Sequence, residues 1–296
     1  MDVLTLNGIT KYYGKIRALN NVSFSVPEGS VFGILGPNGS GKTTMLGIIM
    51  DILRPTSGSF LFFGTPPTGA MRRQIGTLLE TPNFYHYLSG ERNLRIAAEI
   101  KGKGLDQIDE VLHKVNLYQR KTSKFSTYSL GMKQRLAIAS CLLGDPNVLV
   151  FDEPTNGLDP VGIAEIRELI KSIAAEGKTI IMASHLLDEV EKVCTHVGIL
   201  KMGNLLAAGK VDEVLVNEDI VEIGAANMQL LEQALHSLNG YTTIKKQNEY
   251  IQLLFPVGLA NLEKINAHCF NNGVVLNHLR LKKKSLETKF LELTNQ

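Results

Sequence analysis

The sequence has 296 residues, enough for one large domain and a small one or for two modest domains. Of these residues 44% are hydrophobic and 6% aromatic, a composition typical of a globular protein. Its 31 basic and 29 acidic residues give a formal net charge of +2, which argues against broad nucleic-acid binding. Cys141, Cys194 and Cys269 lie far apart without CxxC spacing, so we expect neither a disulfide framework nor a cysteine metal site. With no apolar run near the roughly 20 residues that cross a bilayer, and no secretion-signal layout at the start, we expect a soluble cytoplasmic chain.

The first third of the chain predicts short strands around a glycine-rich loop. Residues 3–35 are β-rich, and the apolar run 31–35, closed by Gly36, is typical of a strand buried on both faces. Apolar spacing over 43–53 predicts a helix, turn residues at 55–58 end it, and 59–63 predicts another strand.

Residues from about 84 to 145 have a helical pattern instead. Apolar residues favour helices around 94–100, 108–115 and 132–143, which we interpret as a helical insertion. Beyond it, buried strands at 148–151 and 179–183 alternate with helices at 163–175 and 186–194. This alternation predicts an α/β fold with a mixed, mostly parallel sheet, a β-rich N-terminal part and the helical insertion.

The pattern changes again after Gly209. It predicts a strand at 220–223, a helix at 228–238, a hairpin of 242–246 and 250–255, a helix at 262–270, a strand at 274–281 and a short helix at 286–293. The order βαββαβ indicates a small α+β domain of ferredoxin-like arrangement. We therefore expect domains 1–218 and 219–296. The basic run 282–284 is interpreted as a solvated face, with contact to anionic lipid as the weaker alternative.

The loop after the strand at 31–35 carries a full phosphate-loop motif between a strand and a helix. Its glycines let backbone N–H groups surround the β- and γ-phosphates, and the helix N-terminus faces the anion. Lys42 supplies charge to the outer phosphates, and the Thr43 hydroxyl is placed to ligate Mg²⁺. The predicted nucleotide-binding residues here are Gly36, Pro37, Asn38, Gly39, Ser40, Gly41, Lys42, Thr43 and Thr44.

Two further strand ends carry polar residues that suit the same site. Asp152 and Glu153 follow the apolar run 148–151, where Asp152 can hold Mg²⁺ and Glu153 can reach a water in line with the γ-phosphate. His185 follows the strand at 179–183, at the edge where open α/β sheets bind ligands. We predict Glu153 as the catalytic base and His185 as a γ-phosphate sensor; a structural histidine or a helix cap is the alternative for His185.

Three more segments complete an ordered set of motifs. Residues 129–135 read Ser-Leu-Gly-Met-Lys-Gln-Arg, residues 156–160 read Asn-Gly-Leu-Asp-Pro, and Tyr13-Gly14 lies upstream. This set resembles the ATP-binding cassette of ABC transporters, a P-loop NTPase fold, over about residues 3 to 215. The resemblance implies an ATPase that uses ATP and Mg²⁺, pairs with a second copy of itself and acts on permease subunits at the inner face of the cell membrane, without nucleic acid.

The resemblance also assigns roles to single residues. Tyr13 would stack on the adenine; Tyr12 is the second candidate, and a plain surface tyrosine the alternative. Ser129 and Gly131, at the N-terminus of a helix expected to begin near Met132, would contact the γ-phosphate held by the other subunit. Asp159 would be the D-loop residue that links the two sites. ATP would then close the pair, and hydrolysis would reopen it.

The sequence departs from the common motifs of this family at two places, and these departures indicate a branch of the family. Leu130 and Met132 alter the signature loop, although its serine and second glycine remain. Glu80 stands where most members have a glutamine near Mg²⁺; it is either a metal ligand or an exposed loop carboxylate. Glu80, the residues that follow it and the signature together resemble the bacitracin-resistance and lantibiotic-immunity exporters, which implies export of peptide antibiotics.

Three aromatic residues, Phe84, Tyr85 and Tyr87, begin the insertion where family members receive the membrane subunits. They are either a partner contact or the core of the insertion. The alternatives for function are a soluble ABC ATPase without a transport role, export of another substrate class, or a different P-loop enzyme. The last would leave residues 129–135 unexplained, and the sequence has no Asn-Lys-x-Asp guanine motif.

Overall fold

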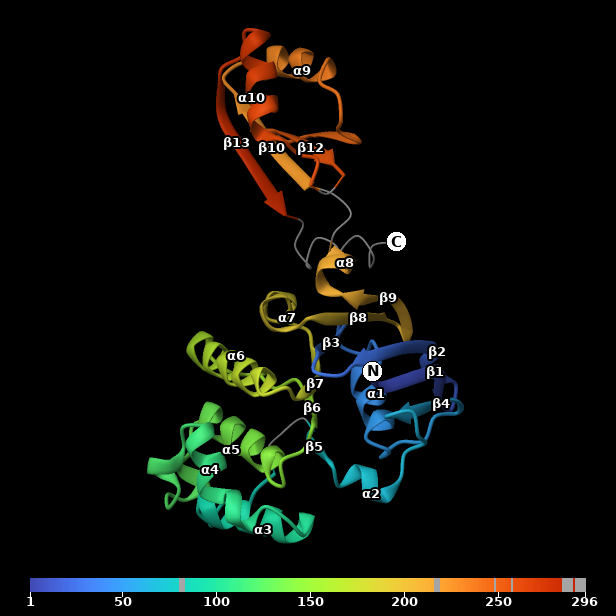
Figure 1. Cartoon of the computed structure of the whole chain (residues 1–296), viewed down its shortest axis with the longest axis vertical. Coiled ribbons are helices and arrows are strands. Elements are labelled where there is room, and N and C mark those ends of the chain that lie inside the picture. Colours follow the sequence, from blue (N-terminus) through green and yellow to red (C-terminus); the bar gives the residue numbers. More distant parts are fainter. Residues whose placement is uncertain (80–82, 216–218, 248, 257, 284–289, 291–296) are drawn as a thin grey trace. The chain divides into compact units, whose positions relative to one another are not determined.

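A six-stranded sheet lies at the centre of the first part of the chain (Figure 1). The computed structural model describes residues 1–79, 83–215, 219–247, 249–256, 258–283 and 290. The strand order is β5 (Ile75–Leu78), β6 (Val148–Asp152), β7 (Thr179–Ser184), β3 (Val31–Leu35), β8 (His196–Lys201), β9 (Asn204–Lys210). Only β9 runs antiparallel to its neighbour. The predicted mixed, mostly parallel sheet is confirmed, although β5, β8 and β9 were not among the predicted strands.

The buried strands explain why their sequences are continuous apolar runs. Every residue of β3, β6 and β7 is buried, because helices and a second sheet cover the two faces. The second sheet has the antiparallel order β2-β1-β4, formed by β1 (Asp2–Tyr13), β2 (Ile16–Pro27) and β4 (Ser57–Phe62). Its inner side chains pack with α1 (Lys42–Ile49) into one hydrophobic core.

The remaining helices of this unit lie between strands or form the insertion. Helix α2 (Gly69–Arg72) precedes β5, α6 (Pro160–Ala175) follows β6, and α7 (Leu187–Val193) follows β7. The insertion contains α3 (Gly90–Lys101), α4 (Ile108–Lys114) and α5 (Leu130–Leu142), with 3-10 turns at Leu105–Gln107, Tyr118–Arg120 and Phe125–Thr127. Helix α5 begins at Leu130 and not near Met132, because the Ser129 side chain accepts a hydrogen bond from the Met132 N–H and caps the helix there.

A second unit contains Asp212–Gln296 and has a core of its own. Its elements are β10 (Asp219–Ala225), α9 (Met228–His236), β11 (Thr243–Lys246), β12 (Ile251–Phe255), α10 (Leu262–Asn271) and β13 (Leu276–Lys283), in the order βαββαβ. They form an antiparallel sheet of order β11-β12-β10-β13. The expected helix at 286–293 falls, except for Phe290, outside the described residues, as does Lys284 of the basic run.

The division between the units lies at 211/212, earlier in the chain than the expected 218/219. Helix α8 (Val211–Leu215) begins directly after β9, and its first residue belongs to the first unit. Val211 is buried there, and its N–H donates to the Thr195 carbonyl. In the described part of the chain no helix has the length and apolarity to span a membrane.

Candidate active site

The phosphate loop joins the C-terminal end of β3 to α1. Gly39 and Gly41 adopt left-handed φ values of +79° and +106°, which a residue with a Cβ adopts only with strain. A Cβ on Gly36 would overlap Ser40 Oγ and the Leu200 carbonyl oxygen, so the first glycine is required for packing. Lys42 is 6% exposed, and its Nζ donates to the carbonyls of Gly36 at 2.8 Å and Pro37 at 3.3 Å. The lysine therefore lies across the loop.

The end of β6 brings two carboxylates to this loop. Asp152 is fully buried as the last residue of β6. Glu153 has a left-handed φ of +49°, and its N–H donates to the Ala183 carbonyl at 3.1 Å. This bend directs the Glu153 side chain toward the loop, where Oε1 lies 3.5 Å from Lys42 Nζ. A strained backbone that aims a carboxylate at a lysine is typical of a functional site.

His185 completes this arrangement from the end of β7. Its Nδ1 lies 2.8 Å from Glu153 Oε2, a distance that fits an Nδ1–H donating to the carboxylate. The two Glu153 oxygens thus contact Lys42 and His185 respectively. The ends of three neighbouring strands, β6, β7 and β3, therefore carry Glu153, His185 and the loop with Lys42, and the carboxylate contacts both the imidazole and the ammonium.

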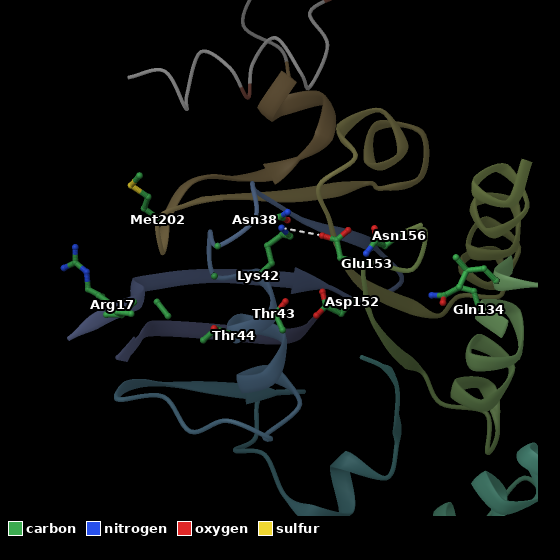
Figure 2. A pocket seen from close by; sticks show the side chains of 15 residues that line it. Arg17, Asn38, Lys42, Thr43, Thr44, Gln134, Asp152, Glu153, Asn156 and Met202 are labelled. Carbon is green, nitrogen blue, oxygen red and sulfur yellow. Dashed lines mark ion pairs between the residues drawn. The ribbon is translucent and has the colours of Figure 1, made fainter. Parts of the chain in front are cut away.

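A cavity of about 640 Å³ opens beside Lys42 and Glu153 and is large enough for a nucleotide (Figure 2). Of the predicted phosphate-loop residues, Asn38, Gly39, Gly41, Lys42, Thr43 and Thr44 line it, with Asp152 and Glu153. Gly36, Pro37 and Ser40 lie in the loop but do not line the cavity.

Sequence reasoning missed several residues that line this cavity. None of them was among the predicted site residues, although three lie in the 129–135 and 156–160 motifs: Ile16, Arg17, Ala18, Leu130, Gln134, Asn156 and Met202. Figure 2 shows Arg17 and Met202 at the opposite end of the cavity from Gln134. The Gln134 side chain is 5% exposed, and its Nε2 has no hydrogen-bond partner in the described part of the chain. The one sequence feature that could have indicated Gln134 as a site residue was its place in the 129–135 motif.

The residues assigned by resemblance lie around the cavity but not in its wall. Tyr13 ends β1, is 46% exposed and has the Lys11 ammonium 5.2 Å from its ring centre, while its cross-strand partner Ile16 lines the cavity. Ser129 is exposed at the N-cap of α5, and Gly131 lies in the first turn of that helix. Asp159 caps α6 by accepting a hydrogen bond from the Gly162 N–H at 2.9 Å. Glu80 lies outside the described residues.

The three aromatic residues of the insertion differ from one another. Phe84 packs edge-on against Phe125, with ring centres 5.2 Å apart. Tyr85 and Tyr87 are 50% and 69% exposed and contact each other. Phe84 thus contributes to the core of the insertion, whereas the two tyrosines are available at the surface.

The oxygen ligands near the loop fit a magnesium ion that a nucleotide brings with it. Thr43 and Asp152 line one cavity and offer a hydroxyl and a carboxylate, which are ligands that Mg²⁺ prefers. In the residues that the structure describes, no group of three His, Cys, Asp or Glu side chains could hold a metal ion.

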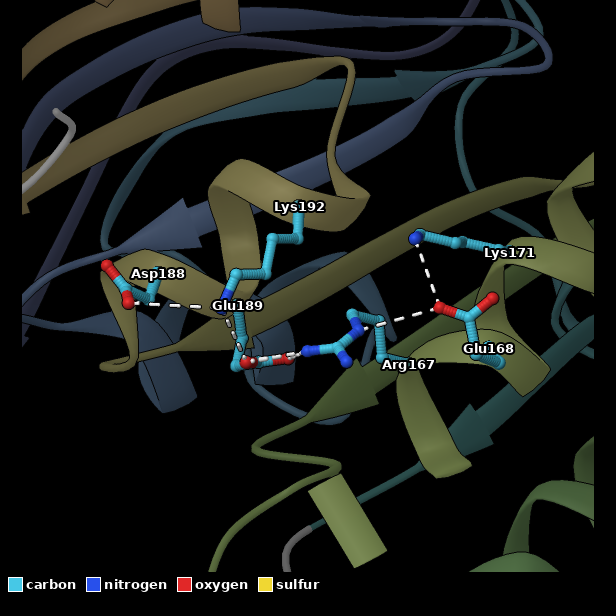
Figure 3. Close-up of polar contacts among 6 residues, drawn as sticks. All are labelled: Arg167, Glu168, Lys171, Asp188, Glu189 and Lys192. Atoms are coloured by element: carbon cyan, nitrogen blue, oxygen red, sulfur yellow. Dashed lines mark hydrogen bonds and ion pairs between the residues drawn. The ribbon is translucent and has the colours of Figure 1, made fainter. Parts of the chain in front are cut away.

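An ion-pair network holds the helices that follow Glu153 and His185 (Figure 3). Arg167 on α6 reaches α7, where its Nη1 lies 2.9 Å from both Glu189 carboxylate oxygens. The Arg167 and Glu189 side chains are 21% and 13% exposed. Lys171 and Lys192 extend the network at more exposed positions. Because α6 and α7 follow the loops that carry the site, this pair fixes their separation.

We expect Arg167→Ala to reduce stability and turnover together. Loss of a partly buried charged hydrogen bond costs about 1–3 kcal/mol of unfolding free energy, and the looser helices lower kcat several-fold with little change in nucleotide affinity. Chemical denaturation and steady-state kinetics measure both effects. The matched control is Lys171→Ala, which removes an exposed contact and changes stability by no more than about 0.5 kcal/mol. Equal effects of the two variants would contradict the positioning role.

Residues 19–156 match the family model described as ABC transporter. The chain is 36% identical, over 98% of its length and 97% of the relative, to the bacitracin transport ATP-binding protein BcrA of Bacillus licheniformis. It is 33% identical to BcrA of Enterococcus faecalis over 98% of its length and 96% of the relative. The lantibiotic transport ATP-binding protein SrtF of Streptococcus pyogenes is 39% identical over 74% of this chain and 98% of the relative.

Solved structures of similar fold cover about 70% of the chain. One is the ADP conformation of MJ1267, an ATP-binding cassette of an ABC transporter, with a TM-score of 0.67 and 27% identity over 72% of this chain and 92% of that one. Another is the dimeric post-hydrolysis state of the ATP-binding cassette MJ0796 bound to ADP and phosphate, with a TM-score of 0.63 and 27% identity over 70% of this chain and 98% of that one.

Proposed function

This chain belongs to the family of ABC transporter ATP-binding proteins, and we propose that it powers the export of peptide antibiotics of the bacitracin or lantibiotic type. It is an ATPase of that family. Support for the substrate class comes from relatives named for bacitracin and lantibiotic transport, similar over 74–98% of the chain. We place the protein at the inner face of the membrane, attached through permease subunits.

The contact of Glu153 with both Lys42 and His185 carries the catalytic proposal. Lys42 and the loop N–H groups would bind the outer phosphates of ATP, and Thr43 and Asp152 would hold Mg²⁺, which neutralises phosphate charge when bound. Glu153 would orient the attacking water and accept its proton. His185 would keep the Glu153 carboxylate in place through Nδ1, which leaves Nε2 to contact the terminal phosphate.

A second copy of the chain would complete the site. Supporting this, Ser129 and Gly131 are not in the wall of their own cavity, and Ser129 is exposed at the start of a 13-residue helix. The N-terminus of such a helix favours an anion, so it suits the γ-phosphate bound by the partner copy. Asp159 would lie at the interface. Tyr13, beside Ile16 at the rim, would stack on the adenine.

The helical insertion offers a surface for the permease. A groove of about 410 Å³ is lined by Phe84, Tyr85, Ile96 and Ile100 with neighbouring residues, and Ile100 is 82% exposed. A second groove shares Ile96 and is lined by Arg92, Arg95 and Lys124 among others. An apolar groove beside a basic one suits an amphipathic segment with an acidic end.

Expression with the permease genes that neighbour it should raise the antibiotic resistance of a sensitive bacterium. We expect the minimal inhibitory concentration of bacitracin or a lantibiotic to rise several-fold. The same cells carrying Glu153→Gln should show no rise. An ATPase that is active in vitro yet changes resistance to neither class would overturn the substrate proposal alone.

The alternative, an ABC ATPase without a transport role, is tested separately. Affinity purification of the chain from detergent-solubilised membranes should recover a multi-span membrane protein. Tyr85→Asp, placed in the apolar groove, should weaken that recovery, whereas Tyr118→Asp, on another part of the insertion, should not. Recovery of soluble proteins only would favour the alternative.

A further inference from the structure

The second unit gathers cations on one face of its sheet. Residues 212–296 have eight basic and ten acidic residues, so the unit as a whole carries no positive excess. Alternate residues of β10 face opposite sides, and Val221 and Ile223 pack with α9 and α10 in the core. Ile220, Glu222 and Gly224 therefore lie on the opposite side, which we call the open face.

The strand register shows which residues share the open face with Glu222. Its cross-strand partners are Gln252 on β12 and Arg280 on β13, and Gln252 pairs in turn with Lys245 on β11. Lys282 pairs with Ile220. Directly paired residues project to the same side, so Lys245, Arg280 and Lys282 are on the open face. His278, opposite Gly224, joins them.

One carboxylate balances part of this charge. Glu222 is 5% exposed; its Oε1 lies 3.1 Å from Gln252 Nε2 and 3.5 Å from Lys282 Nζ, and its Oε2 lies 3.7 Å from His278 Nε2. Burial raises the pKa of Glu222, but these hydrogen bonds and the Lys282 charge lower it more, so the pKa lies below its ordinary value. The ionised carboxylate offsets Lys282, while Lys245 and Arg280 stay exposed.

Two other lysines of the unit do not face this side. Lys246 pairs with Glu232 of α9 on the helix side, and Lys264 lies on α10. Among the residues that the structure describes, Glu222 is the one acidic side chain that the four strands place on the open face. The open face therefore carries a net positive charge, although the second unit as a whole does not.

We propose that the open face of the second unit binds the anionic headgroups of a lipid bilayer. Its cations lie on both edge strands, β11 and β13, three strand spacings or about 14 Å apart. Charges spread over a sheet in this way match a layer of many anions better than one anion or one narrow peptide. Tyr250, beside His278 with ring centres 6.0 Å apart, adds an amphipathic ring of the kind that lies at headgroup level.

Nucleic acid fits this face less well. Single-stranded nucleic acids bind to sheets on which exposed aromatic rings stack with the bases. The described residues that the four strands place on the open face include no Phe, Tyr or Trp, and Tyr250 outside β12 already packs on His278. The inference goes beyond the proposed function, because it concerns neither ATP nor the exported compound.

Vesicle sedimentation with the purified full-length chain tests the proposal without ATP. We expect binding to vesicles of phosphatidylcholine with phosphatidylglycerol, no binding to phosphatidylcholine alone, and release at high salt. Arg280→Glu should lower the bound fraction about fivefold or more, since each cation near such a surface contributes about that factor. Lys264→Glu makes the same charge change on α10 and should leave binding unchanged. Thermal unfolding confirms that both variants are folded.

Three outcomes would overturn the proposal. They are equal binding to neutral vesicles, equal losses in the Arg280→Glu and Lys264→Glu variants, and no binding to either kind of vesicle. Polyglutamate and single-stranded DNA serve as further probes. If either binds through Arg280 while phosphatidylglycerol vesicles do not, the face recognises an acidic protein segment or a nucleic acid instead of a bilayer.

Discussion

Replacing Glu153 by glutamine should lower the ATP hydrolysis rate by about 10²–10⁴-fold, the contribution typical of general-base catalysis. The amide keeps the size of the side chain and can still contact His185 Nδ1 and Lys42 Nζ, which lie 2.8 and 3.5 Å from the carboxylate. It cannot accept a proton from water. Nucleotide affinity should therefore change little, so the variant should accumulate as an ATP-bound pair in gel filtration.

The control for this variant is Glu168→Gln, which makes the same change at an exposed carboxylate on α6. It should hydrolyse ATP at the normal rate and elute as the unsubstituted chain does. A normal rate for Glu153→Gln would remove Glu153 as the base. A loss of nucleotide binding would instead show that the Lys42–Glu153 contact mainly shapes the phosphate loop.

Replacing Ser129 by arginine should abolish ATPase activity while a single chain still binds nucleotide. Ser129 is exposed and does not line its own cavity, so a long cation there leaves the phosphate loop of the same chain unchanged. It would block the approach of a second copy to the terminal phosphate. Equilibrium binding of a fluorescent ATP analogue and steady-state hydrolysis measure the two effects. Ser172→Arg, at an exposed position of α6, should leave both near normal.

Mixing two inactive variants separates a blocked interface from a damaged fold. Ser129→Arg keeps Lys42, and Lys42→Ala keeps Ser129, so a mixed pair contains one composite site with both residues. We expect the mixture to recover part of the ATPase activity that neither variant has alone. Without recovery, the Ser129 contribution would have to come from within one chain. Ser129→Ala, which also removes the α5 cap, measures how much of the loss is due to stability, on the order of 1 kcal/mol.

Features formed by residues close together in the sequence could be predicted without the structure. The phosphate loop, residues 36–43, is a contiguous pattern whose glycine spacing follows from the turn that it must make. Asp152, Glu153 and His185 were found because polar residues directly after buried apolar runs mark the ends of parallel strands. The βαββαβ order of the second unit followed from hydrophobic periodicity in the same way.

Other features depend on contacts between distant segments. Arg17, Gln134 and Met202 come from β2, α5 and the β8–β9 turn, and only the folded chain brings them to one cavity. The start of α5 depends on a side-chain cap at Ser129, which a periodic pattern places poorly. The division at 211/212 depends on which unit buries Val211.

The sequence by itself determined the fold class, the family and the chemistry of the phosphate loop, because strand and helix periodicity and a contiguous anion-binding turn are local properties of the chain. Tertiary structure decided that Glu153 contacts Lys42 with one oxygen and His185 with the other. It also decided that Lys245 and Arg280 share one face of a sheet. Such pairings depend on strand order and register, which are set by packing among segments far apart in the chain.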